Sequence, residues 1–267
     1  MPKETLEEKR RRFLETAKAS ISNAYAGEEH SIIQAINAYN EAEKVRGILY
    51  ERLEEWYSMY FPEAKVNNRA TFSRMITTIG ANKKKATEEQ LTAIFGDKAG
   101  SMRDQISRSI GREPGAEEFE SIKMLAEAES SLDRLQVKMD AYLAKSVKKV
   151  MPNISYLIEY KIAAELLAKA GSMQRLSTMP ASTIQLLGAE KALFKHIKFG
   201  TKAPKYGVLF KLPQIGNANR RVRGRLARIY ATKISIASRA DAISKRFIAD
   251  KLKVHLDEAC KKVYKAK

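Results

Sequence analysis

The sequence has few of the residues that interrupt helices or crosslink chains. Cys260 is its only cysteine, which excludes an intramolecular disulfide and a zinc site built from several cysteines. Glycine and proline number 13 and 7 in 267 residues. No uninterrupted apolar run reaches about 18 residues, and residues 1–12 are too charged for a secretory signal. These absences predict a protein of the cell interior, cytoplasmic in a prokaryote and nuclear in a eukaryote, that does not cross a membrane.

Signatures of catalysis are also missing. Neither the phosphate-binding pattern GxxxxGK[ST] nor the dinucleotide-binding pattern GxGxxG occurs. The three histidines, His30, His196 and His255, are far apart in sequence and have no metal-binding spacing. Paired carboxylates such as Glu54–Glu55 lie on charged helix faces, where solvation explains them. The sequence therefore predicts a protein that is not an enzyme and that uses no cofactor and no metal ion.

Positive charge is the most prominent feature that is present. The formal net charge is +18 and the pI is near 9.8, which predicts binding to a polyanion. Between residues 188 and 233 there are 12 lysines and arginines and one acidic residue, Glu190. A membrane surface would attract the same charge, but its binding needs large apolar residues beside the lysines. The apolar residues of this segment are spaced for burial instead.

Apolar residues recur three or four positions apart through most of the chain, which predicts an all-α fold without strands. Long helices are expected at residues 29–60 and 116–150, ending before Pro62 and Pro152. They should pack antiparallel as two arms, with Leu49, Leu53 and Trp56 of the first facing the second. Shorter helices are expected between the arms, at residues 68–79, 87–95 and 98–110. Exposed residues there, such as Phe95 or Met102, could pair two subunits.

Further helices are expected in the second half of the chain. One should cover residues 153–172 and close at Gly171, and another should begin at an Asn217 or Asn219 cap and run to about residue 249. Residues 188–198 should form an amphipathic helix. Its core-facing side would carry Ala192, Leu193 and Ile197, and its other side Lys191, Lys195 and Lys198.

The arginines at the start of the helix after Asn219 suit a phosphate ligand, because helix N-termini and guanidinium groups both favour phosphate. Structured RNA fits this pattern better than duplex DNA, since no helix-turn-helix or zinc-finger spacing occurs. The candidate RNA-binding residues are Glu190, Lys191, Lys195, His196, Lys198, Lys202, Lys205, Tyr206, Arg220, Arg221, Arg223, Arg225 and Arg228. We expect Lys191, Lys195, Lys205, Arg223 and Arg225 to form one continuous exposed surface.

Several separated motifs resemble those of the Nop-domain family. The signature of that family resembles two segments of this chain, Gly188–Phe194 and Pro204–Phe210. The flanking motifs occur in the expected order and cover nearly the whole chain: Arg52–Tyr57, Met151–Ile154, Gly171–Met173, Pro180–Gln185 and Ile236–Asp241.

The resemblance implies a helical coiled-coil module with antiparallel long arms at residues 1–150, and an all-helical Nop domain at residues 151–267. It implies a scaffold that binds a kink-turn RNA of the box C/D type together with the ribosomal-type protein that recognises the kink-turn. The coiled-coil module would allow a homodimer. Family members that guide RNA methylation carry a further N-terminal domain that binds fibrillarin. This chain starts almost at the first arm, which makes fibrillarin binding doubtful.

Two other functions are compatible with the residues alone. A general nucleic-acid-binding protein would bind any duplex and weaken uniformly with salt. A coiled-coil adaptor would bind no RNA.

Overall fold

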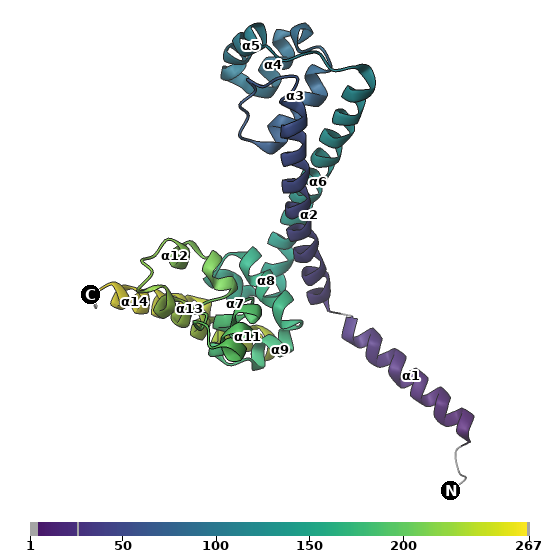
Figure 1. Ribbon diagram of the computed structural model, residues 1–267. Coiled ribbons are helices and arrows are strands. Elements are labelled where there is room, and N and C mark those ends of the chain that lie inside the picture. Colours follow the sequence, from purple (N-terminus) through teal and green to yellow (C-terminus); the bar gives the residue numbers. More distant parts are fainter. Residues whose placement is uncertain (1–4, 26, 266–267) are drawn as a thin grey trace. The chain divides into compact units, whose positions relative to one another are not determined.

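The computed structural model describes residues 5–25 and 27–265, and every regular element within them is helical, as the sequence predicts (Figure 1). Backbone packing divides the chain into two compact units. Residues 38–140 form one, called the arm unit here, and residues 1–37 with 141–267 form the other, called the larger unit. Helices α2 (Glu28–Tyr57) and α6 (Ala116–Val150) contribute residues to both. The functional division at residue 150 stays a prediction.

In the arm unit, α2 and α6 lie side by side and run antiparallel (Figure 1). The Gln136 side chain donates a hydrogen bond to the Tyr39 carbonyl (3.2 Å), and Arg46 Nε donates one to Glu129 Oε1 (2.9 Å). Later residues of α2 therefore meet earlier residues of α6. This arrangement confirms the predicted antiparallel pairing.

Three short helices complete the arm unit: α3 (Arg69–Ile79), α4 (Glu88–Phe95) and α5 (Ala99–Arg108), separated by 3-10 turns at Lys83–Lys85 and Gly96–Lys98. Local caps set their starts. Asn68 accepts from the Thr71 amide at the start of α3, and Thr87 and Gln90 form a capping box at α4. Such caps are readable from sequence, so the predicted bounds were nearly right.

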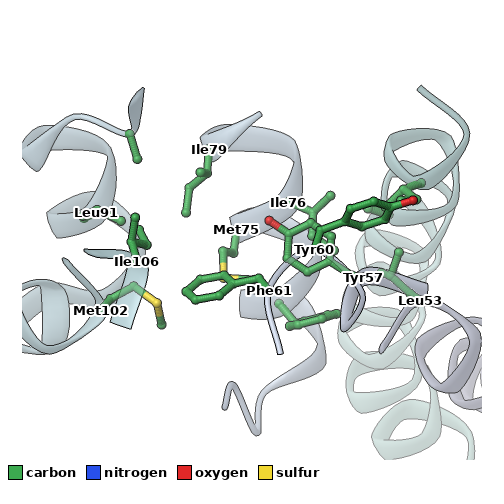
Figure 2. Close-up of a cluster of buried hydrophobic side chains, with 14 of the residues drawn as sticks. Leu53, Tyr57, Tyr60, Phe61, Met75, Ile76, Ile79, Leu91, Met102 and Ile106 are labelled. Carbon is green, nitrogen blue, oxygen red and sulfur yellow. The ribbon is translucent and has the colours of Figure 1, made fainter. Parts of the chain in front are cut away.

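A hydrophobic core joins these short helices to the end of α2 (Figure 2). Leu53 and Met75 are fully buried in it, and Trp56 packs against it, as expected for the arm face. One expectation was wrong. Met102 is only 5% exposed and Phe95 is half-buried against the same core, so neither is an exposed residue that could pair subunits. The apolar face of α5 is already used within the chain.

The larger unit is built around α13 (Arg223–Arg239), which packs against α7, α9, α10, α12 and α14. Its inward face carries small and large apolar residues in alternation, including Leu226, Ala227 and Ala231. The other helices of this unit are α1 (Leu6–Tyr25), α7 (Pro152–Leu157), α8 (Tyr160–Ala170), α9 (Met173–Thr178), α10 (Ala181–Leu186), α11 (Glu190–Phe199), α12 (Pro213–Gly216) and α14 (Ala249–Lys265). A 3-10 turn covers Val208–Lys211.

Two helices that were expected to be continuous are broken. Residues 153–172 form α7 and α8, because Ile158 is extended (φ −139°, ψ 162°), although Gly171 closes α8 in the predicted left-handed conformation. The helix expected to reach residue 249 ends at Arg239 and continues as a π-helical turn, Ala240–Ser244. Lys245 (φ 55°) then terminates it. Apolar spacing is unchanged across both breaks, so periodicity cannot reveal them.

Asp241 explains why the second break is stable. Its carboxylate accepts hydrogen bonds from the Asn153 and Ile154 amides (both 3.0 Å) and from the Asn153 side chain (2.7 Å). Burial raises the pKa of Asp241 above its ordinary value. These bonds tie the π-helical turn to the start of α7, a tertiary constraint with no local sequence signal. Among the described helices, none is both long enough and apolar enough to span a membrane.

Candidate nucleic-acid interface

The candidate interface is organised by a close crossing of two backbone segments in the larger unit. The Gly207 amide donates to the Gln185 carbonyl (3.0 Å), and the Val208 amide donates to the Leu187 carbonyl (2.7 Å). A Cβ on Gly207 would lie 1.9 Å from the Leu187 carbonyl oxygen. Only glycine fits this approach. The crossing fixes the loop before Val208 against the end of α10.

Gly188, next to this crossing, begins the segment that leads into α11. Its φ of 87° is a left-handed value that favours glycine. Glu190 Oε1 accepts a hydrogen bond from the Gly188 amide (2.6 Å), so this carboxylate binds a backbone amide two residues before it in the chain. Glu190 was predicted to face RNA. In the structure one of its oxygens has this local partner, and its contact with RNA stays a prediction.

A cationic cavity of about 380 Å³ lies where the crossed loop meets the start of α13. Four cationic side chains line it: Lys205, Arg221, Arg225 and Arg228. Its remaining lining residues are Gln185, Pro204 and Gly224, so no carboxylate contributes to it. We call this the cationic cavity. Sequence analysis predicted its four cations, and the fold brings them together.

Two residues that sequence reasoning left out give the cationic cavity its shape. Gln185 is buried and donates from Nε2 to the Lys205 carbonyl (2.6 Å), which holds the Lys205 backbone at the cavity edge. Gly224 leaves room for the aliphatic part of Lys205, which would lie 3.5 Å from an added Cβ. Gln185 belongs to a motif segment and Gly224 lies among the arginines at the start of α13, but a neutral amide and a glycine carry no charge signal that would mark them as cavity residues.

The four cations have no competing internal anions. Within the described part of the chain, none of them pairs with a carboxylate. Unpaired guanidinium and ammonium groups around a cavity suit a multiply charged oxyanion, because arginine can donate two parallel hydrogen bonds to a phosphate. The arrangement can therefore hold a phosphate. Groups of three or more His, Cys, Asp or Glu that could hold a metal ion do not occur among the described residues.

Arg223 and Tyr206 are used differently from what was predicted. The Tyr206 and Phe210 rings stack at 4.9 Å, and the Arg223 guanidinium lies 5.3 Å from the Phe210 ring centroid. Arg223 Nε donates to the Ala218 carbonyl (2.8 Å). Arg223 is half-buried and does not line the cationic cavity. Arg223 was expected in one continuous exposed surface; it is half-buried because the Phe210 ring and the Ala218 carbonyl engage it, and its part in RNA binding stays a prediction.

The remaining predicted residues lie outside the lining of the cationic cavity. Arg220 is exposed in the turn before α13, where Asn219 accepts from the Arg221 amide (3.0 Å) and so caps the turn and not the helix. Exposed lysines of α11 and its following loop make up most of the rest: Lys191, Lys195, Lys198 and Lys202. The His196 ring donates from Nδ1 to the Thr201 carbonyl and fixes that loop.

α11 differs from the predicted amphipathic helix because it buries no residue at all. Ala192 and Ile197 were expected to face a core, yet both are exposed, and Ile197 is 75% exposed. Leu193 is half-buried. Large apolar side chains at Phe194 and Phe199 are also exposed (61% and 65%). The spacing that sequence analysis assigned to a core therefore describes an open apolar surface on the molecule.

A family model described as "Nop: snoRNA binding domain, fibrillarin" matches residues 38–264. An uncharacterised NOP5 family protein of Methanocaldococcus jannaschii is 36% identical over 252 residues, covering 93% of this chain and 60% of that protein. Nucleolar protein 56 of Mus musculus is 35% identical over 240 residues, covering 86% of this chain and 41% of that protein. The chain thus spans about half the length of these relatives.

A solved structure described as the crystal structure of a fibrillarin/Nop5p complex is also similar. The alignment covers 91% of this chain and 82% of that chain, with 20% sequence identity and a TM-score of 0.45. This likeness is too weak to support a statement about partners.

Proposed function

We propose that this chain, which belongs to the Nop family, is a non-catalytic scaffold that binds a kink-turn RNA of the box C/D type jointly with the protein that recognises the kink-turn. The observation that carries the RNA part is the cationic cavity, where four unpaired cations surround a space large enough for a phosphate. The matched family is described as snoRNA-binding. RNA supplies the repeated phosphates that such a site and the +18 net charge would attract.

A protein partner is supported by α11. Phe194, Ile197 and Phe199 are exposed on a helix that has no fully buried residue, and water-exposed apolar side chains of this size are typical of interaction surfaces. Lysines on the same helix would contact RNA while the apolar residues contact the kink-turn-binding protein. Such a helix would bind the two partners together better than either alone.

The test is an electrophoretic mobility shift with a kink-turn RNA, with and without its binding protein. Replacing Arg225→Gln together with Arg228→Gln removes two cations of the cavity. We expect weaker binding, and the slope of log affinity against log salt should become about two units less steep. Folding should change little, because both side chains are exposed.

The matched control is Lys261→Gln with Lys262→Gln, which removes the same charge from exposed positions on α14. This control should keep most of the affinity. If the two double variants lose the same RNA affinity, the chain binds nucleic acid by general charge attraction. Wild-type binding that does not depend on the kink-turn or on its protein would lead to the same conclusion. No RNA binding by the wild-type chain would leave the coiled-coil adaptor as the function.

Self-association through the arm unit is part of the proposal. Ile48 on α2 and Met124 and Val137 on α6 are 67%, 68% and 63% exposed in the described residues of this unit. They offer apolar surface that a second copy could cover.

Fibrillarin binding, which the sequence alone made doubtful, becomes part of the proposal, because the matched family's description names fibrillarin. We include fibrillarin among the candidate partners. A location inside the cell, nucleolar in a eukaryote, is consistent with relatives named nucleolar proteins.

A further inference from the structure

A second surface of the larger unit carries an exposed aromatic pair that the proposed function does not use. Tyr156 on α7 and Phe247, in the loop before α14, are 51% and 52% exposed. Their ring centroids are 5.6 Å apart and the ring planes are nearly perpendicular (88°). In an edge-to-face pair each ring keeps at least one face that its partner does not cover. Flat aromatic surface is therefore open to solvent.

The loop that holds Phe247 is fixed on both sides by one buried side chain. Asn153 Nδ2 donates to the Arg246 carbonyl (2.9 Å), and Asn153 Oδ1 accepts from the Ile248 amide (2.7 Å). Asn153 is itself held by the buried Asp241 carboxylate. Phe247 is the residue between the two bonded neighbours. Its outward position is therefore set by the fold and does not result from a loose loop.

The Tyr156 ring is also held in place. Its edge-to-face contact with Phe247 orients it, and interaction with the Asp250 carboxylate on the first turn of α14 raises the pKa of the Tyr156 hydroxyl above its ordinary value. Two rings with restricted orientation lose little conformational entropy when a ligand binds. This is the property expected of a binding platform.

The segment from residue 245 to residue 251, which holds Phe247, carries three cationic residues and one acidic residue. Arg246 and Lys251 are exposed and form no ion pair within the described part of the chain, and the exposed Lys245 lies beside them. Asp250, which is exposed, is the acidic residue of this segment. Open aromatic faces beside unpaired cations are the combination by which proteins bind single-stranded nucleic acid, because each base stacks on a ring while its phosphate meets a cation.

The size of the patch favours a nucleotide over a protein partner. Beyond the two rings, the exposed large apolar residues nearest in sequence are Ile243 (67% exposed) and Val254 on α14 (57% exposed). A stable protein interface takes roughly 20–30 residues from each side. A stacked base needs one or two rings.

We propose that Phe247 and Tyr156 form a stacking platform for an unpaired nucleotide of RNA, with Arg246 contacting its phosphate. The inference rests on the proposed function to the extent that RNA is the ligand in both. It differs in the part of the RNA that is bound, since the cationic cavity needs only a phosphate and the platform needs a base that is free to stack.

The experiment measures fluorescence anisotropy of two labelled RNAs with the full chain: a short unstructured oligonucleotide of mixed sequence, and a blunt-ended hairpin whose loop is replaced by a linker without bases, so that it has no unpaired nucleotide. Phe247→Ala should weaken binding of the oligonucleotide roughly tenfold and leave hairpin binding nearly unchanged. Phe247→Leu should be as weak as Phe247→Ala, because it keeps apolar volume without an aromatic face. Phe247→Trp should keep the affinity.

Ile243→Ala is the matched control, since it removes exposed apolar surface from the same segment without touching a ring. It should bind both RNAs like the wild type. Circular dichroism of each variant checks that the fold is kept. If Phe247→Leu binds as well as the wild type, the patch needs only apolar area and suits a protein partner, which overturns the inference.

Unchanged oligonucleotide binding by Phe247→Ala also overturns it. These failures differ from a failure of the proposed function. Hairpin binding that depends on Arg225 and Arg228 but not on Phe247 removes the stacking platform alone. Wild-type binding to neither RNA removes both proposals.

Discussion

At the scale of single residues, Gly207 has the tightest environment in the candidate interface. Replacing Gly207→Ala places a methyl group 1.9 Å from the Leu187 carbonyl oxygen, so one of the two backbone segments must move. We expect the free energy of unfolding to fall by roughly 3 kcal/mol or more. Urea unfolding followed by circular dichroism measures this change.

Gly224→Ala is the corresponding control in the same unit. Its added Cβ would make ordinary contacts with Lys205 at 3.5 Å, and alanine favours the helix. We expect a gain of about 0.5–1 kcal/mol. Equal losses for the two alanine variants would show that the chain crossing does not require glycine.

Glu118 offers a pH-dependent test in the arm unit. Hydrogen bonds from the Arg112 guanidinium (2.8 and 3.0 Å) and the Gly115 amide (2.9 Å) lower its pKa to about 2. A carboxyl whose pKa is depressed on folding stabilises the fold above its ordinary pKa of 4.5. That contribution is lost as the pH falls from about 4.5 to about 2.

Glu118→Gln should therefore lower the melting temperature at neutral pH, and its difference from the wild type should shrink as the pH falls through that window. Glu117→Gln, next to it and exposed, should show a smaller difference that changes less with pH. Thermal melts across the acidic range measure both. A difference for Glu118→Gln that does not depend on pH would contradict the assignment.

Sequence analysis recognised the importance of several residues without their physical reasons. It placed Gly207 in a motif, but the Leu187 carbonyl that requires glycine lies 20 residues earlier and is visible only in the fold. It grouped Arg223 with its cationic neighbours by charge. Arg223 contacts the ring of Phe210 and does not line the cationic cavity, and no local pattern indicates that contact.

At the scale of helices, a buried polar cluster between α2 and α6 gives a direct test of what holds the two arms together. Arg46 is 8% exposed and binds Glu129 (2.6 Å) and Asp133 (2.8 Å), and Glu129 is fully buried. Arg46→Met should cost about 3–5 kcal/mol, because it leaves a buried carboxylate without its counterion. Urea unfolding is the suitable measurement, since urea does not screen charge.

Arg46→Met combined with Glu129→Leu should recover most of that loss, because a buried apolar pair can replace an ion pair. Arg52→Met breaks the exposed pair with Glu55 and should cost less than about 1 kcal/mol. If Arg46→Met costs no more than Arg52→Met, the buried cluster does not stabilise the arms.

The helices themselves were predicted with uneven success. α6 and the short helices of the arm unit were placed almost correctly, because prolines and capping residues mark their ends. The break between α7 and α8 and the end of α13 were missed. Asp241 and Asn153 fix the end of α13 through a contact across 88 residues of sequence, and such a contact leaves no local signal.

At the scale of the whole molecule, the apolar surface of the arm unit predicts self-association. Met124→Glu places a charge on the exposed face of α6, and we expect it to weaken a homodimer roughly tenfold or more. Sedimentation equilibrium measures the dissociation constant. Thr92→Glu puts the same charge on an exposed position of α4 and should not change it. A wild-type chain that stays monomeric at high concentration would rule out this contact.

The exposed position of α11 also has a thermodynamic consequence. It has ten residues and buries none of them, and isolated helices shorter than about 12–15 residues are only marginally stable in water. Its ends are held by the Glu190 bond to Gly188 and the His196 bond to Thr201, and in its middle Leu193 is only half-buried. A partner that covers this helix would also complete its ordering. Binding of that partner should then have a favourable enthalpy, because the helix becomes fully ordered, and an unfavourable entropy for the same reason. The heat capacity should fall, because apolar side chains leave water.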